Sequence, residues 1–171
     1  MAEPRFFSKE WADAVLDALV AGSSEQDRAG KLQMYWDFFA LIKSMYPASW
    51  ALGCRDLPAE LGQGPAYLLI QWGGGTVTSC EIVGPDDRPP PTHLPSAPSP
   101  SPFTATYVLA MDYADWRALH DGYDAQRTVM YRKILLEDGD LLEFFKTIYF
   151  FVECLAVIAK VPADYPALAT R

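Results

Sequence analysis

The sequence predicts an α/β fold of the α+β type. Short β-favouring apolar runs and amphipathic helical segments both occur along the chain, in clearly separated stretches. Half of the 171 residues are hydrophobic and 13% are aromatic, so a sizeable core is available. This length is typical of one domain, and we therefore expect residues 1–171 to form a single one.

Two helices are expected at the amino terminus. The first begins after Ser8, a residue type that caps helices, and runs to about Ala21. The second begins after Ser23 or Ser24 and ends before Pro47, because a proline disfavours helical geometry in the residue before it. Apolar residues at helical spacing form one broad face of this second helix: Leu32, Tyr35, Trp36, Phe39, Ile42 and Met45.

Three strands are expected next, over 49–54, 66–72 and 76–83. Glycines 73–75 predict a hairpin between the second and third strands, since glycine adopts positive φ without steric cost. Side chains alternate between the two faces of a strand. Polar residues mark the opposite face, so we expect these side chains to point towards the helices: Leu68, Ile70, Trp72, Cys80 and Ile82.

The last third of the chain has the clearest signals for where its helices and strands begin and end. It predicts a strand over 104–111, a helix over 113–120 capped by Asp112, a short helix over 124–130 and a strand over 133–136. The same alternation points Leu109, Met111, Ile134 and Leu136 inward. A final helix begins at Asp140 and runs to about Val161, before Pro162.

That final helix is apolar around most of its circumference. Its charges, at positions 143, 146, 153 and 160, form roughly one stripe, whereas a half-exposed surface helix needs only about a 100° apolar stripe. Core, a partner subunit, a membrane or an apolar ligand must cover the rest. Two of these charges would lie mid-bilayer at a cost of about 2.5–3.5 kcal/mol each. We therefore expect no integral membrane insertion.

A family resemblance follows from three stretches: Thr106 to Leu119, Asp121-Gly122, and Arg132 to Asp140 followed by the apolar helix. Together they resemble the sterol carrier protein type 2 (SCP-2-like) lipid-binding domain. The resemblance implies an antiparallel sheet of about five strands with helices packed on one face and a long apolar C-terminal helix. Two features depart from the family: Arg132 stands where a small residue is usual, and residues 84–102 form an insertion containing eight prolines.

The resemblance implies non-catalytic carriage of a sterol, fatty acid or acyl-CoA in an apolar tunnel between the sheet and the final helix. It implies no cofactor. With the apolar surplus, it predicts these ligand-binding residues: Trp36, Phe39, Leu68, Ile70, Trp72, Leu109, Met111, Phe144, Phe145, Ile148, Phe151, Val152 and Leu155.

Composition and motifs exclude several other classes. The net charge of −8 argues against nucleic acid and against anionic membrane surfaces. The two histidines have no second metal ligand near them in sequence, and no catalytic motif occurs, so neither a metal site nor a catalytic set is expected. Three isolated cysteines and the lack of a secretory signal pattern predict a cytoplasmic protein.

The proline-rich segment is expected to be an exposed polyproline loop. Its Pro95-Ser-Ala-Pro98 matches a P-x-x-P ligand, and a lid over the pocket mouth is an alternative.

Two other functions remain open from sequence. The pocket could host an enzyme acting on a polyketide-like or steroid-like substrate, with an acid or base among these residues: Tyr35, Tyr107, Tyr131, Asp112 and Glu137. The final helix could alternatively form a homodimer or assembly interface.

Overall fold

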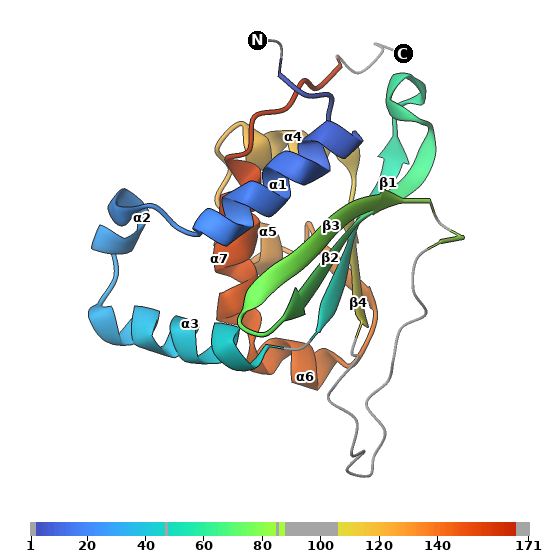
Figure 1. Ribbon diagram of the computed structural model, residues 1–171. Helices are drawn as coiled ribbons and strands as arrows, with labels where there is room; N and C mark the ends of the chain where they lie inside the picture. The colour runs from blue at the N-terminus through green and yellow to red at the C-terminus, as the bar shows by residue number, and fades with distance from the viewer. Residues whose placement is uncertain (1–2, 47, 85, 88–105, 167–171) are drawn as a thin grey trace.

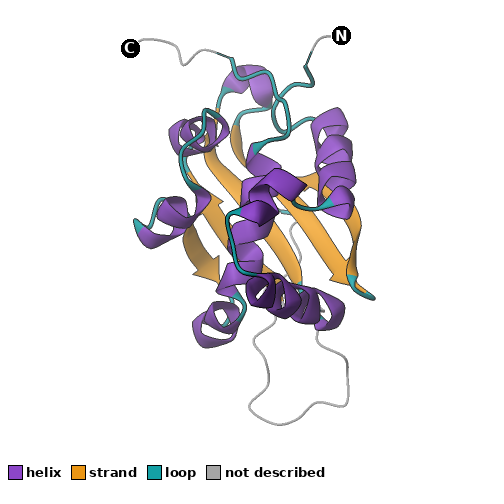
Figure 2. Cartoon of the chain, turned by 90° about the vertical axis from the view of Figure 1, so that its left-hand side faces the viewer, coloured by secondary structure: helices purple, strands orange, loops and turns teal. Residues whose placement is uncertain are grey.

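The helices lie on one face of a five-stranded sheet, as predicted (Figures 1 and 2). The computed structural model describes residues 3–46, 48–84, 86–87 and 106–166. Most of the proline-rich segment therefore lies outside the described residues, and its predicted roles stay predictions.

The sheet is mixed rather than wholly antiparallel, which corrects one detail of the expectation. Its strand order is β3-β2-β1-β4-β5. Strands β1 (Ser49–Leu57), β2 (Gly64–Gly73) and β3 (Thr76–Val83) form an antiparallel meander, and a short 3₁₀ turn (Ala59–Leu61) precedes β2. Strand β4 (Thr106–Met111) pairs with β1 in parallel, and β5 (Leu135–Asp138) closes the other edge antiparallel to β4. Strand β4 follows β3 in the chain, but it lies beside β1, on the other side of β2 and β1 from β3.

The hairpin and the strand faces are as predicted. Gly74 and Gly75 make the β2–β3 turn at φ +60° and +79°. The side chains predicted to face the helices all belong to the main hydrophobic cluster or, as Ile82 and Leu136 do, pack against it partly buried. Residues from α1, α4, α6 and α7 also belong to this cluster, and α3 packs against it. On the other face, Ala51, Tyr67 and Val108 form a small separate cluster.

The amino-terminal helices begin where their caps predict. Ser8 accepts a hydrogen bond from the Trp11 amide at the start of α1 (Lys9–Ala21), and Ser24 forms a capping box with Asp27 in α2 (Glu25–Ala29). The predicted second helix is in fact two, because α2 stops at Gly30 and α3 (Gln33–Met45) starts again after Leu32. Glycine is a poor helix former, and this break lets the chain turn.

The last third contains α4 (Tyr113–His120), α5 (Ala125–Met130), β5, α6 (Leu141–Lys146) and α7 (Ile148–Ala159). The expectation that Asp112 caps α4 with its side chain is wrong. Asp112 occupies the N-cap position, but its carboxylate pairs with Arg55, and the Tyr113 amide instead donates to Asp56 at 2.6 Å.

The prediction of one long final helix is also wrong, because Thr147 divides this segment into α6 and α7. Asp140 caps α6 as predicted, by accepting from the Glu143 amide. The Thr147 hydroxyl donates to the Phe144 carbonyl at 3.2 Å, which competes with continued helical hydrogen bonding. Of these two helices, only α7 is buried on several sides. Helix α6 turns away from it and runs along the end of the sheet (Figure 1).

Gly139, between β5 and α6, provides a sharp test of this geometry. Its φ is +117°, and a Cβ there would lie 2.8 Å from Cδ1 of Tyr107. We expect Gly139→Ala to lower the free energy of unfolding by about 2–4 kcal/mol, through backbone strain plus the clash. Gly122→Ala is the control, since φ is +102° there and no atom lies within 4 Å. Urea titrations giving equal losses for both variants would contradict the close approach.

Candidate functional site: an apolar cavity at the β4–β5 edge

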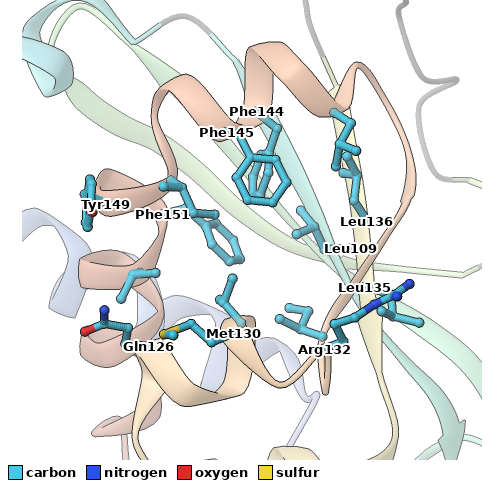
Figure 3. Close-up of a pocket in the computed structure, with 15 residues that line it drawn as sticks. Leu109, Gln126, Met130, Arg132, Leu135, Leu136, Phe144, Phe145, Tyr149 and Phe151 are labelled. Carbon is cyan, nitrogen blue, oxygen red and sulfur yellow. The ribbon is translucent and has the colours of Figure 1, made fainter.

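A cavity of about 740 Å³ lies between the β4–β5 edge of the sheet and helices α5, α6 and α7 (Figure 3). Fifteen side chains line it, and only Gln126, Arg132 and the hydroxyl of Tyr149 bring polar atoms. The lining residues are Leu109, Gln126, Val129, Met130, Arg132, Ile134, Leu135, Leu136, Leu141, Phe144, Phe145, Ile148, Tyr149, Phe151 and Val152.

The floor of the cavity is set by the core. Phe151 is fully buried and packs edge-on against Trp50 and Phe144, at ring-centroid distances of 5.1 Å in both cases. Leu109 reaches the same floor from strand β4. Ile148, Phe151 and Val152 share one face of α7 because they stand three and four residues apart.

The mouth of the cavity is apolar and faces water. Met130, Leu141, Phe145 and Tyr149 all line the cavity, and each is more than half exposed. In Figure 3 the labelled Tyr149, Phe145 and Met130 lie around the hollow on three sides. Soluble proteins usually cover such side chains, so an apolar mouth of this kind points to a ligand or a partner.

Arg132 is the one cation of the lining. It makes no ion pair or side-chain hydrogen bond within the part of the chain that the structure describes. Its φ is +56°, a left-handed conformation that costs an ordinary L-residue about 1–2 kcal/mol. A small residue such as glycine would avoid that cost. Arg132 is exposed, and its unpaired guanidinium lies at the edge of an apolar cavity.

Six of the thirteen predicted ligand-binding residues line this cavity: Leu109, Phe144, Phe145, Ile148, Phe151 and Val152. The structure places five others in the packed core beneath the helices, away from this cavity: Leu68, Ile70, Trp72, Met111 and Leu155. The periodicity correctly turned them inward, but adjoining side chains fill the space around them.

The last two predicted residues belong to α3. Trp36 is buried under α2, where its indole donates to the Arg28 carbonyl at 3.1 Å and Arg28 lies over the ring. Phe39 contacts Phe150 and lines only a small gap beside α7. Neither closes the end of the large cavity.

The sequence did not point to the cavity residues of α5 and of the turn after it. Gln126, Val129 and Met130 lie on a six-residue helix, which is too short for a periodic signal. Arg132 was visible only as a departure from the family pattern.

None of the five acid or base candidates lines the cavity. Asp112 and Glu137 both accept from Arg55, at 3.0 and 2.8 Å, which ties β1, β4 and β5 together. Tyr107 is buried against Phe144, and burial raises its pKa to about 12. Tyr131 is exposed. Tyr35 donates to Glu153 at 2.6 Å, and burial and this hydrogen bond both raise its pKa.

Buried Glu153 fixes α3 against α7. It is 6% exposed, accepts the Tyr35 hydroxyl and pairs with Lys31. A buried carboxylate requires such partners, because an isolated charge there would be costly. The contact is structural, and among the described residues no group of three His, Cys, Asp or Glu side chains is arranged to hold a metal ion.

The three cysteines are free and buried. Burial raises the pKa of the Cys54 and Cys80 thiols from 9.0 to about 12 and that of Cys154 well above 9.0. Below pH 9 the thiols are protonated in both the folded and the unfolded state. As the pH rises above 9 the unfolded state loses these protons first, so the folded state is destabilised.

We expect the free energy of unfolding to fall by about 1.4 kcal/mol per buried thiol for each pH unit above 9. Urea titrations at pH 8 and pH 10 measure this loss. A Cys54→Ala, Cys80→Ala variant is the control and should lose less stability over the same interval. An equal loss in both proteins would contradict the role of the thiols.

Comparison with solved structures identifies the fold. The crystal structure of sterol carrier protein 2 superposes with a TM-score of 0.62 at 17% sequence identity, covering 92% of this chain and 99% of that one. The chain has the fold of sterol carrier protein 2. A solution structure from Thermus thermophilus, of a conserved hypothetical protein described as a candidate sterol carrier protein, agrees at TM-score 0.60 and 16% identity, covering 98% and 96% of the two chains.

The likeness is structural rather than sequential. No protein-family model matches the chain, and no curated protein matches its sequence. The sterol carrier protein 2 fold agrees with the resemblance drawn from residues 106–140.

Proposed function

We propose that this protein binds and carries a single hydrophobic ligand, without transforming it, in the cavity between β4–β5 and α5–α7. The observation that carries the proposal is the cavity itself: about 740 Å³, lined almost wholly by apolar side chains and opening through an apolar mouth. Ligand pockets typically measure about 300–1,000 Å³ and combine such a lining with few polar groups. The two similar structures, a sterol carrier protein 2 and a candidate sterol carrier protein, support lipid carriage as the general class.

The energetics suit a carrier. Burying about 300 Å² of apolar ligand surface is worth about 7 kcal/mol before the cost of association. Before that cost is subtracted, about 7 kcal/mol corresponds to a Kd of about 10 μM, so binding is no tighter than micromolar and the ligand can be released.

Within this class we propose a fatty acid or acyl-CoA rather than a sterol. The unpaired Arg132 at the edge of the cavity supports this choice, because a guanidinium pairs with a carboxylate or phosphate. A sterol offers only a hydroxyl. The free thiols support a reducing compartment, the cytoplasm, as the location of the protein. No helix among the described residues has the length and apolar character needed to cross a membrane.

Native mass spectrometry of freshly purified protein, followed by organic extraction and lipid analysis, tests the proposal. An acyl lipid at near one-to-one stoichiometry is the expected result. A co-purifying sterol would keep carriage and overturn the choice of ligand. If the protein is apo and shows no fluorescence titration with cis-parinaric acid, a fluorescent fatty acid, carriage itself is wrong.

A further inference from the structure

One end of the molecule exposes an unusual amount of apolar surface. Helices α3 and α6 both lie at this end, next to the start of α7 (Figures 1 and 2). Eight large apolar side chains are each between 48% and 75% exposed there. We call this surface the apolar end face; its members are Met34, Phe38, Leu41 and Met45 of α3, Leu141, Leu142 and Phe145 of α6, and Tyr149 of α7.

The α3 part of this face is a regular stripe. Met34, Phe38, Leu41 and Met45 are spaced four, three and four residues apart, so they share one side of the helix. Helix α3 has a second apolar stripe, including Phe39 and Ile42, that packs on the core. The helix is thus apolar towards the protein and also towards solvent. Core packing explains only the inner stripe.

The face is continuous with the mouth of the cavity. Tyr149 contacts Tyr35 of α3 and lines both the large cavity and the small gap beside Phe38. Leu141 and Phe145 belong to the end face and also to the lining of the cavity. Tyr149 therefore connects the outer stripe of α3 with the lining of the cavity.

Charges around the face balance, although the chain as a whole carries −8. On α3, on α6 with its N-cap, and at the cavity edge, three basic side chains oppose three acidic ones: Lys43, Lys146 and Arg132 against Asp37, Asp140 and Glu143. A neutral face on an acidic protein suits a surface with no net charge. The long stems of the lysines and the Tyr149 hydroxyl also suit the boundary between an apolar layer and water.

We propose that the apolar end face docks on the surface of a zwitterionic lipid bilayer, with α3 and α6 lying in the headgroup layer and the cavity mouth against the acyl chains. The inference rests on the proposed function in one respect, that the cavity takes a lipid. Docking in this orientation lets the ligand pass between bilayer and cavity without crossing water. Amphipathic helices bind such interfaces through the area of their buried apolar face.

The test is flotation with phosphatidylcholine vesicles, using a Leu41→Glu, Leu142→Glu variant. Both side chains are exposed and neither lines the cavity, so the fold and the cavity stay intact. We expect the vesicle-bound fraction to fall by about tenfold or more, since two charges replace buried apolar contacts. Val20→Glu is the matched control: Val20 is 55% exposed on α1, and this variant should float as the wild type does.

Four results would overturn the proposal: failure of the wild type to float, equal flotation of the double variant, equal loss in Val20→Glu, or stronger flotation with phosphatidylserine-rich vesicles. A wild-type dimer in analytical ultracentrifugation that the double variant dissociates, without flotation, would assign the face to a second copy of the chain. Titration of each protein with cis-parinaric acid, without vesicles, measures the cavity separately. If the wild type fails to bind cis-parinaric acid but still floats with the vesicles, carriage is refuted and docking stands.

Discussion

Replacing Phe150 by alanine is expected to lower the free energy of unfolding by about 3–5 kcal/mol, the largest effect on stability that we predict. Phe150 is 2% exposed on α7 and points away from the cavity lining, into the core. Its ring lies between 4.7 and 5.6 Å, centroid to centroid, from four others: Phe39, Tyr46, Trp50 and Trp72. Four large rings cannot collapse into the space left behind, so a cavity remains.

Urea unfolding followed by circular dichroism measures this loss. Phe145→Ala is the control, since Phe145 is 51% exposed at the mouth and its truncation should cost about 1 kcal/mol or less. Comparable losses for the two variants would mean that the aromatic cluster around Phe150 is not closely packed.

Replacing Ile148 by aspartate is expected to weaken binding of cis-parinaric acid by about tenfold or more. Ile148 lines the cavity, and a carboxylate there must lose its water when an acyl chain enters. It would also repel the carboxylate of the ligand. Ile148 is the first residue of α7, where a negative charge favours the helix by about 0.3–1 kcal/mol, so the fold should tolerate the change.

Leu142→Asp is the matched control for this titration. Leu142 lies in the first turn of α6, is 75% exposed and does not line the cavity. In the absence of vesicles this variant should bind cis-parinaric acid as the wild type does. If both variants retain full affinity, the ligand does not occupy this cavity; if both lose it, the effect is one of net charge.

Most of the local structure could be predicted from sequence. Alternation placed Leu68, Ile70 and Trp72 on the buried face of β2, and consecutive glycines made the β2–β3 turn. Capping side chains located the starts of α1 and α6. These features depend on a residue and its near neighbours, so the sequence contains the whole physical cause.

Features that depend on distant pairing were not predictable. The parallel pairing of β4 with β1 joins two segments that are far apart in the chain. The division at Thr147 carries no glycine or proline signal, and it exists because α6 packs along the end of the sheet while α7 enters the core.

The candidate site was likewise only partly predictable from the sequence. Hydrophobicity identified residues that face inward, such as Ile70 and Phe151, but could not say which of them border empty space. A void forms where side chains from separate elements fail to meet, and here those elements are α5, α6, α7 and the β4–β5 edge. Sequence by itself therefore determined the fold class, the buried faces and the apolar surplus. Only the tertiary structure decided that the surplus becomes a cavity with an exposed apolar mouth, because packing is a property of residues far apart in the chain.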